Sequence, residues 1–296
     1  GYCTEFLMEG VEAPIEEIRQ AVAPFGESLL VVGAEGYVKG HIHTNDPDGL
    51  LAAAARFGRM VRTKVEDMSE QHTEILAMAG ALEALVAVAQ GYGLVKAFRS
   101  LGARVVAGGQ TDNPSVEDLL LALRSVPSPK VILLPNNPNV LMAAQQAKEL
   151  AQSFGKEVHL LPTRTMGAGL AAAIRFQPEL SPEELLPEME EAASRSETLE
   201  VTWASREAEL DGLKVEKGQP IGLLEGRLAL VGKTPKEVLK ALVRTAQEGK
   251  EVLTVFYGPN AEEEGLAEEL AQVFPELVVE VLPGGPEPYA YLAVLE

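Results

Sequence analysis

The sequence is poor in cysteine and in basic residues. Its single cysteine excludes an internal disulfide framework and favours a reducing compartment, so we expect a cytoplasmic protein. The 25 lysines and arginines stand against 44 aspartates and glutamates, and the formal net charge of −19 repels a phosphate backbone. Nucleic acid is therefore a poor candidate partner.

Long apolar stretches are also missing. No run approaches the roughly 20 apolar residues that a membrane-spanning helix needs, so we expect no membrane span. The N-terminus has no basic segment followed by an apolar one, which predicts no signal peptide. Apolar residues nevertheless make up 46% of the 296 residues, enough to bury the cores of two or three domains.

Residues 1–72 have the pattern of a small mixed domain. Strand-like and helix-like segments follow one another in the order 2–9, 14–26, 28–43, 46–58 and 60–68, and a glycine turn divides the third segment into two strands. This βαββαβ order is typical of a ferredoxin-like unit. We expect a linker at 73–81 to follow it.

Cys3, His41 and His43 form the sharpest candidate site in this unit. In a ferredoxin-like sheet the first and third strands are antiparallel neighbours, so the start of one lies beside the end of the other. The two histidines share a strand face, because side chains alternate with a period of two. A thiolate and two imidazoles suit Zn²⁺ and leave its fourth position open.

Glu5 lies on the same strand as Cys3, two residues further on. It is a further candidate for the metal shell, either as a ligand or as a group that orients a histidine. The spacing alone also fits a second interpretation, in which the histidines are a solvated pair and the cysteine is a buried structural residue.

Residues 82–296 predict a two-lobed α/β domain. Short continuous apolar runs alternate with helical segments in 82–178, which is typical of a mainly parallel sheet covered on both faces. The stretch 178–187 is rich in proline and charge and predicts a boundary. Residues 188–296 mix helices with a long β region and predict the second lobe.

Three polar turns follow successive strands of the first lobe: GGQTDNPS (108–115), LLPNNPNV (133–140) and LLPTRTMGAG (160–169). Turns of this kind at one sheet edge form the usual ligand site of a doubly wound fold, and helix N-termini favour anionic groups. The candidate ligand- or partner-binding residues are Thr111, Asn113, Ser115, Asn136, Asn137 and Thr163. The alternative is that these residues only cap helices and form turns.

Two further histidines have simpler interpretations. His72 follows the last strand of the first unit and is predicted to be exposed, and His159 lies in a buried strand and is predicted to be a hydrogen-bonded core residue. The sequence contains no GxSxG, HExxH or P-loop motif and no carboxylate cluster for Mg²⁺. We therefore expect no catalytic residue in this chain.

The segments GYCTEF, HIHTNDP, GGQTDNPSVEDLL and VILLPNNPNV occur in this order, and together they resemble the ATP-binding subunit of bacterial fatty acid kinase, a relative of dihydroxyacetone kinase (DAK). The resemblance implies that the chain is the middle and C-terminal portion of that subunit. The DAK-like domain that binds ATP and Mg²⁺ is then expected upstream of Gly1. A start without methionine, already inside a strand, agrees with this expectation.

The resemblance also implies a function. The whole enzyme is expected to phosphorylate a fatty acid presented by a separate DegV-like binding protein, yielding an acyl phosphate for lipid synthesis. Cys3, His41 and His43 match the family's zinc-binding residues, and the C-terminal domain is expected to have a DegV-like fold and to dock the carrier. The resemblance implies a homodimer, and this portion alone is expected to be inactive.

Two other functions remain open at this point. The chain is alternatively a stand-alone fatty-acyl- or lipid-binding protein whose two-lobed domain holds the ligand itself. It is alternatively a zinc-dependent hydrolase, which needs a general base near the metal, and only Glu5 and His72 are available for that role. A glycine turn near the end, GGPEPYAY (284–291), departs from the family pattern and is given no role.

Overall fold

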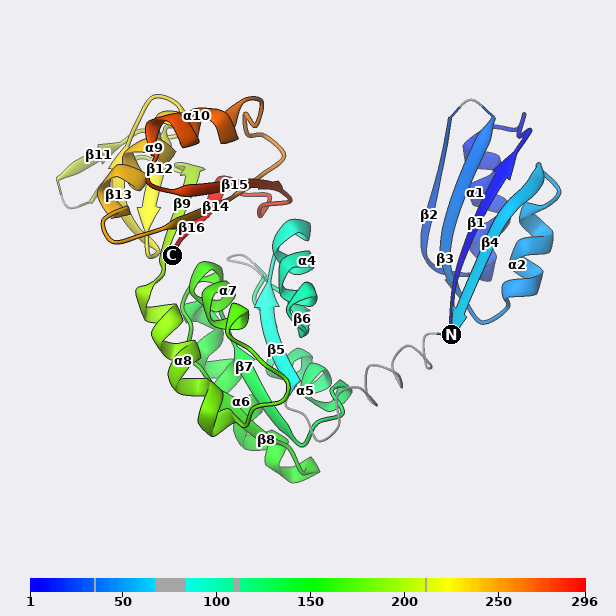
Figure 1. The fold of residues 1–296 in the computed structure, drawn as a ribbon, viewed down its shortest axis with the longest axis horizontal. Helices are drawn as coiled ribbons and strands as arrows, with labels where there is room; N and C mark the ends of the chain where they lie inside the picture. The colour runs from blue at the N-terminus through cyan, green and yellow to red at the C-terminus, as the bar shows by residue number, and fades with distance from the viewer. Residues whose placement is uncertain (35, 68–83, 109–111, 211) are drawn as a thin grey trace. The chain divides into compact units, whose positions relative to one another are not determined.

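A computed structural model of the chain describes residues 1–34, 36–67, 84–108, 112–210 and 212–296 (Figure 1). The chain divides into two compact units, Gly1–Gly80 and Ala81–Glu296, called unit 1 and unit 2 below. The expected linker at 73–81 lies outside the described residues.

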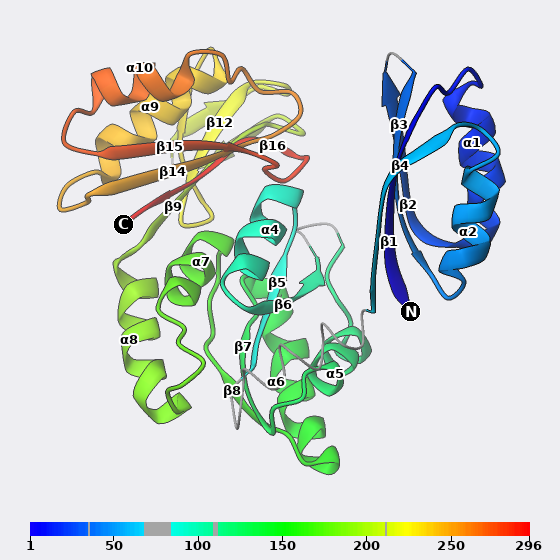
Figure 2. The ribbon, with the colours of Figure 1, turned by 45° about the vertical axis from the view of Figure 1, so that its right-hand side comes forward.

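Unit 1 is a four-stranded antiparallel sheet with two helices on one face (Figure 2). Its elements are β1 (Tyr2–Glu9), α1 (Ile15–Val22), the 3₁₀ turn η1 (Ala23–Phe25), β2 (Gly26–Ala34), β3 (Tyr37–Thr44), α2 (Pro47–Ala54) and β4 (Arg59–Asp67). The strand order is β2-β3-β1-β4, so β1 and β3 are the central pair, as expected from the sequence.

The alternation of apolar residues decides which face of this sheet is covered. Phe6 and Met8 of β1 and Ile42 of β3 are buried in one cluster with Ile18 of α1 and Leu50 of α2. The residues between them in the strands point to the other face, which none of the described helices of unit 1 covers. The candidate metal ligands lie on this open face.

The first lobe of unit 2 has the parallel sheet that the continuous apolar runs predict. Its elements are β5 (Ala84–Ala89), α4 (Tyr92–Ser100), β6 (Ala103–Ala107), α5 (Val116–Ser125), β7 (Lys130–Leu134), η2 (Pro138–Val140), α6 (Leu141–Ala151), η3 (Gln152–Phe154), β8 (Glu157–Leu160), α7 (Met166–Ile174) and α8 (Pro182–Arg195). The strand order is β6-β5-β7-β8, and all three pairings are parallel. The chain changes direction across the sheet between β5 and β7, where an α/β fold places its ligands.

The second lobe is built on a mixed six-stranded sheet in the order β13-β12-β9-β16-β14-β15. Its elements are β9 (Glu197–Trp203), β10 (Ala208–Leu210), β11 (Leu213–Val215), β12 (Pro220–Leu224), β13 (Arg227–Val231), α9 (Pro235–Ala246), β14 (Val252–Tyr257), α10 (Leu266–Val273), β15 (Val278–Pro283) and β16 (Tyr289–Leu295). Strands β10 and β11 form a separate hairpin.

The stretch expected to be a boundary, 178–187, contains the start of helix α8. Ser181 and Glu184 form a reciprocal capping box, and Pro182 occupies the first helical position, where its missing N–H costs nothing. Leu185 and Met189 of this helix are fully buried in the same cluster as Leu292 of β16. Proline and charge therefore mark a helix start here, and the two lobes share a core.

Candidate functional site

The pairing of β1 with β3 brings the three candidate metal ligands together. Cys3 lies directly opposite His43, and Glu5 lies directly opposite His41. All four side chains point to the open face of the unit 1 sheet, because each is separated from the next on its strand by one residue. The sequence predicted this convergence from strand order and periodicity.

The three candidate ligand atoms lie close to one another. Cys3 Sγ lies 3.9 Å from His41 Nε2, and His41 Nε2 lies 3.3 Å from His43 Nε2. All three ligand atoms lie within 4.8 Å of one another. A tetrahedral zinc ion with ordinary bond lengths needs about 3.6 Å for the S–N edge and about 3.3 Å for the N–N edge. The N–N distance matches this geometry, and the sulfur would have to move closer to the imidazoles for the three side chains to share a zinc ion.

Glu5 occupies the position of an orienting group for His41. Its Oε1 lies 3.2 Å from His41 Nδ1, the ring nitrogen other than the one facing His43. The hydrogen bond with His41 is the main cause that lowers the pKa of Glu5, so the carboxylate stays ionised. A carboxylate that accepts the second N–H of a ligating imidazole fixes the tautomer and direction of the ring.

The thiol of Cys3 is partly buried among acidic neighbours. Its burial, followed by the charges of Glu5 and Glu66, raises its pKa, while Lys64 opposes the effect. Without a metal the sulfur is therefore a protonated, weakly reactive thiol at neutral pH. A bound cation would reverse this balance, because a metal ligand must be a thiolate.

Basic side chains lie beside the candidate ligands on the open face. Lys64 is opposite Glu5 across β1 and β4, and Lys39 and Arg62 flank Leu7 in the next row of the sheet. Lys64 also forms an ion pair with Glu66 at 2.7 Å. Together with Glu5 and Glu66 these residues make a surface of mixed charge beside the site, in contrast to the chain's net charge of −19.

The strand-end residues of unit 2 divide into two groups. Asn136 and Thr163 are both buried and bonded to each other: Thr163 Oγ1 donates to Asn136 Oδ1 (2.7 Å) and accepts from Asn136 N (3.1 Å). Asn136 Nδ2 donates to the carbonyl of Val88 (2.9 Å), and its φ of 57° is one that asparagine tolerates better than most residues. These two residues tie the ends of β5, β7 and β8 together.

The other strand-end residues are more exposed. Asn137 Nδ2 donates to Asn113 Oδ1 (3.3 Å), which links two of the three predicted turns. Ser115 caps α5 in a capping box with Asp118, the group whose pKa is lowered by hydrogen bonds from the backbone and hydroxyl of Ser115. Thr111 lies outside the described residues. Ligand binding by these residues stays a prediction.

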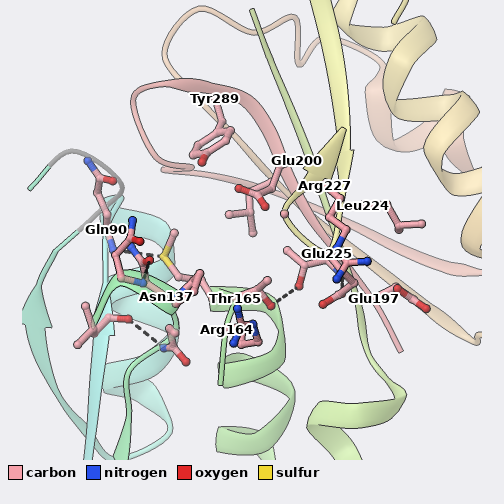
Figure 3. A pocket seen from close by; sticks show the side chains of 18 of the residues that line it. Gln90, Asn137, Arg164, Thr165, Glu197, Glu200, Leu224, Glu225, Arg227 and Tyr289 are labelled. Carbon is pink, nitrogen blue, oxygen red and sulfur yellow. Dashed lines mark hydrogen bonds between the residues drawn. The ribbon is translucent and has the colours of Figure 1, made fainter. Parts of the chain in front are cut away.

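A cleft of about 870 Å³ opens between the two lobes of unit 2 (Figure 3). The first lobe contributes the strand-end residues Asn136 and Asn137, together with Arg164 and Thr165 at the start of α7. Hydrogen bonding across the lobes joins Thr165 Oγ1 to Thr198 Oγ1 at 2.8 Å. The edge of the parallel sheet at which the sequence predicts a ligand site thus forms one wall of the cleft.

The second lobe supplies cleft residues that the sequence pattern did not identify. Glu200 of β9 and Tyr289 of β16 are buried, and Glu225 lies in the β12–β13 turn, where its carboxylate accepts a hydrogen bond from Thr198 N. Burial is the main cause that raises the pKa of Glu200 and of Glu225. Glu200 stands between the apolar residues Leu199 and Val201 of β9, and this was the available signal, since a charged residue is rarely buried in a central strand.

His159 lies on the surface of unit 2 beside two glutamates. His159 is hydrogen-bonded, as predicted, with its Nε2 2.8 Å from Glu157 Oε1, although its ring is only partly buried. Glu183 lies close to this pair, so a second His and carboxylate group exists on the surface of unit 2. His72 lies outside the described residues. None of the helices in the described ranges has the length and apolarity to cross a bilayer.

Two family matches cover almost the whole chain. Residues 1–75 match the middle domain, and residues 84–296 match the C-terminal domain, of the FakA-like family of fatty acid kinase subunits. The chain therefore belongs to the FakA-like family.

Individual relatives are longer than this chain. Protein YloV of Bacillus subtilis (strain 168) is 33% identical over 318 residues, and an uncharacterized protein of Staphylococcus aureus (strain USA300) is 30% identical over 314 residues. Each match covers 100% of this chain and 57% of the relative. The chain thus spans little more than half the length of these relatives.

Solved structures of DegV family proteins share the fold. The DegV family protein Cg2579 from Corynebacterium glutamicum has a TM-score of 0.52 at 14% identity, covering 73% of this chain and 97% of its own. A DegV family protein from Thermus thermophilus described for its fatty acid binding has a TM-score of 0.50 at 19% identity, covering 73% and 99%. At these identities the likeness is one of fold.

Proposed function

We propose that this chain is the middle and C-terminal portion of a fatty acid kinase subunit. It holds zinc in unit 1, docks a DegV-like fatty-acid-binding protein, and supports ATP-dependent formation of an acyl phosphate as a homodimer in the cytoplasm. ATP and Mg²⁺ belong to a further, DAK-like domain of the same protein. The observation that carries the proposal is the consecutive match of residues 1–75 and 84–296 to two domains of this one family.

Zinc is proposed from the side chains themselves. Cys3, His41 and His43 supply one sulfur and two nitrogens that lie near one another, and a zinc ion bound by these three would keep a fourth position toward the open face. Zinc bound there supplies a Lewis acid and a local positive charge. The chain's own contribution is to hold the ligands on two paired strands and to place Lys39, Arg62 and Lys64 on the same face, where they attract an anionic group.

The docking function predicts a stable complex with a carrier. The purified chain, immobilised and exposed to the DegV-like fatty-acid-binding protein of the same organism loaded with oleate, should bind it saturably, with a Kd in or below the micromolar range typical of specific complexes. The same mixture should not hydrolyse ATP. Binding is measured by biolayer interferometry and ATP turnover by phosphate release.

Two outcomes would contradict this proposal. Absence of saturable carrier binding removes the docking role, and acyl phosphate formation by this chain and carrier alone removes the need for a further kinase domain. A matched control is bovine serum albumin loaded with oleate, which presents the same ligand on an unrelated surface. It should give no saturable signal.

Glu5 offers a test of the zinc site that leaves the ligands in place. Glu5→Gln should weaken zinc binding by about 10–100-fold, because the carboxylate no longer fixes the tautomer and direction of His41. The affinity is measured by competition with a chromophoric chelator. Glu12→Gln removes the same charge from an exposed position of unit 1 and should leave the affinity unchanged. Equal affinities for the two variants would mean that Glu5 does not orient the histidine.

The two alternative functions make different predictions. A stand-alone acyl-binding protein should release a stoichiometric fatty acid into organic extract, detected by mass spectrometry. A zinc-dependent hydrolase should show esterase or phosphatase activity that Cys3→Ser abolishes. The hydrolase has little support in the described residues, since Glu5 is already committed to His41.

A further inference from the structure

The cleft of unit 2 has an acidic inner wall that the proposed function does not use. Glu197 and Glu200 of β9 and Glu225 of the β12–β13 turn line it, and Glu200 is only 6% exposed. The two arginines that line the cleft, Arg164 and Arg227, are exposed residues. Within the described ranges no ion pair reaches Glu200 or Glu225 from either arginine. Among the described residues, the buried Glu200 carboxyl thus has no ion pair with a basic side chain, whereas the more exposed Glu225 feels the charge of Lys250.

Tyr289 adds an independent sign that this wall is built for a ligand. The residue is 3% exposed and lines the cleft, and its hydroxyl is buried without a hydrogen-bond partner. Figure 3 shows the hydroxyl and the Glu200 carboxyl directed toward the same space from neighbouring strands. Burial, followed by the charge of Glu200 and a hydrogen bond with it, raises the pKa of Tyr289. The two groups therefore interact, but the contact falls short of ordinary hydrogen-bond geometry.

Burying the Tyr289 hydroxyl and the Glu200 carboxyl side by side costs free energy when no ligand bonds to them. The buried hydroxyl of Tyr289 and the buried carboxyl of Glu200 both lose hydration, and their weak interaction with each other compensates only part of that loss. Both groups are satisfied at once by a group that donates several hydrogen bonds and carries positive charge. Ammonium and guanidinium are the common organic groups with that property.

A fatty acid fits this wall poorly. Its carboxylate would meet the negative charges of Glu197 and Glu225, and it could approach Glu200 only if that carboxyl were protonated. The opposite wall presents the polar side chains of Asn137, Gln90 and Thr165 (Figure 3), although apolar side chains, among them Val88, Met166 and Leu292, also line the cleft. The cleft of unit 2 therefore favours a cationic ligand over a fatty acid.

We propose that the interlobe cleft of unit 2 binds a small organic cation, an amine or a guanidine, with Glu200 as its counterion. The cationic group donates to a carboxylate oxygen of Glu200 and to the hydroxyl oxygen of Tyr289, and the Tyr289 proton turns to Glu200. Glu225 adds negative charge at the edge of the site. Arg164 and Arg227 lie on the exposed rim, where they leave room for an anionic substituent of the ligand.

The test uses agmatine, which carries a guanidinium and an ammonium group. Isothermal titration of the full chain in 150 mM NaCl should show saturable binding, while sodium octanoate should show none. Salt is included because the net charge of −19 attracts cations weakly everywhere. Glu200→Gln should raise the Kd for agmatine at least tenfold, since it keeps the shape of the side chain and removes its charge.

A second variant of the site and a matched charge control accompany Glu200→Gln. Tyr289→Phe deletes a buried atom that has no partner, so the fold should tolerate it, and the Kd should rise at least threefold. Glu280→Gln neutralises an exposed glutamate of β15 and should leave the Kd unchanged. The proposal is overturned if agmatine does not bind saturably, if octanoate binds instead, or if neither Glu200→Gln nor Tyr289→Phe weakens binding relative to Glu280→Gln.

Discussion

Cys3→Ser should remove zinc from the purified chain and lower the melting temperature of unit 1. Metal that binds only the folded state stabilises it by about 4 kcal/mol when its free concentration is a thousandfold above the Kd. For a domain of roughly 80 residues each kcal/mol corresponds to about 4–8 °C, so we expect a loss of about 15–30 °C. Elemental analysis measures the zinc, and differential scanning calorimetry resolves the transition of unit 1.

Thr4→Val is the matched control for this substitution. Thr4 is the next residue of β1 and points to the helix-covered face, where its hydroxyl is buried without a partner. Replacing it by an isosteric apolar residue should leave stability unchanged or slightly higher, because an unmade hydrogen bond is removed. Zinc content should stay that of the unmutated chain. A chelator should then lower the melting temperature of Thr4→Val and leave that of Cys3→Ser unchanged.

The zinc proposal has a clear contrary result. Unmutated chain prepared with zinc in the medium and found without stoichiometric metal would make Cys3, His41 and His43 an ordinary group of polar residues. The same conclusion follows if Cys3→Ser and Thr4→Val melt together. Family membership would stand in either case, since it rests on the sequence of the whole chain.

The convergence of Cys3 with the histidines was predictable because it depends on short-range rules. Period-two alternation places His41 and His43 on one face, and the βαββαβ order makes their strand the neighbour of the first strand. The role of Glu5 was only half predictable. Its choice between ligand and orienting group depends on register, and the register places Glu5 opposite His41 while Cys3 is opposite His43.

Asn136 and Asn137 show which structural difference the sequence pattern could not predict. The pattern predicted both as ligand- or partner-binding residues at a strand end. Asn137 is only partly buried, whereas Asn136 is fully buried and its amide is bonded to Val88 and Thr163. These partners are 48 and 27 residues away along the chain. A local pattern contains no information about such long-range pairing.

Glu200 was missed for a related reason. It is one of two glutamates in β9, and a glutamate in a strand is usually solvent-exposed, so the sequence did not show that Glu200 is buried. The other lobe covers this face of the sheet, as the shared cluster of Leu185, Met189 and Leu292 shows. Lobe packing is a tertiary property, so the cleft and its acidic wall appear only in the folded chain.

Gly169→Ala should destabilise unit 2 by about 2–4 kcal/mol, even though alanine is the better helix former. A Cβ at position 169 would lie 1.8 Å from Asn136 Oδ1, far inside the contact distance of real atoms. Asn136 cannot move away easily, because its amide bonds to Val88 and Thr163 would be broken in a buried environment. For a unit of this size we expect the melting temperature to fall by about 5–15 °C in calorimetry.

A double variant separates the clash from a general intolerance of α7 to substitution. Asn136→Gly removes the amide that the new methyl group meets, and glycine accepts the positive φ of that position. Alone it should be destabilising, because the bonds to Val88 and Thr163 are lost. Combined with Gly169→Ala it should cost less than the sum of the two single changes, since the methyl group then fills the vacated space. Simple additivity would show that Gly169 is needed for another reason than its contact with Asn136.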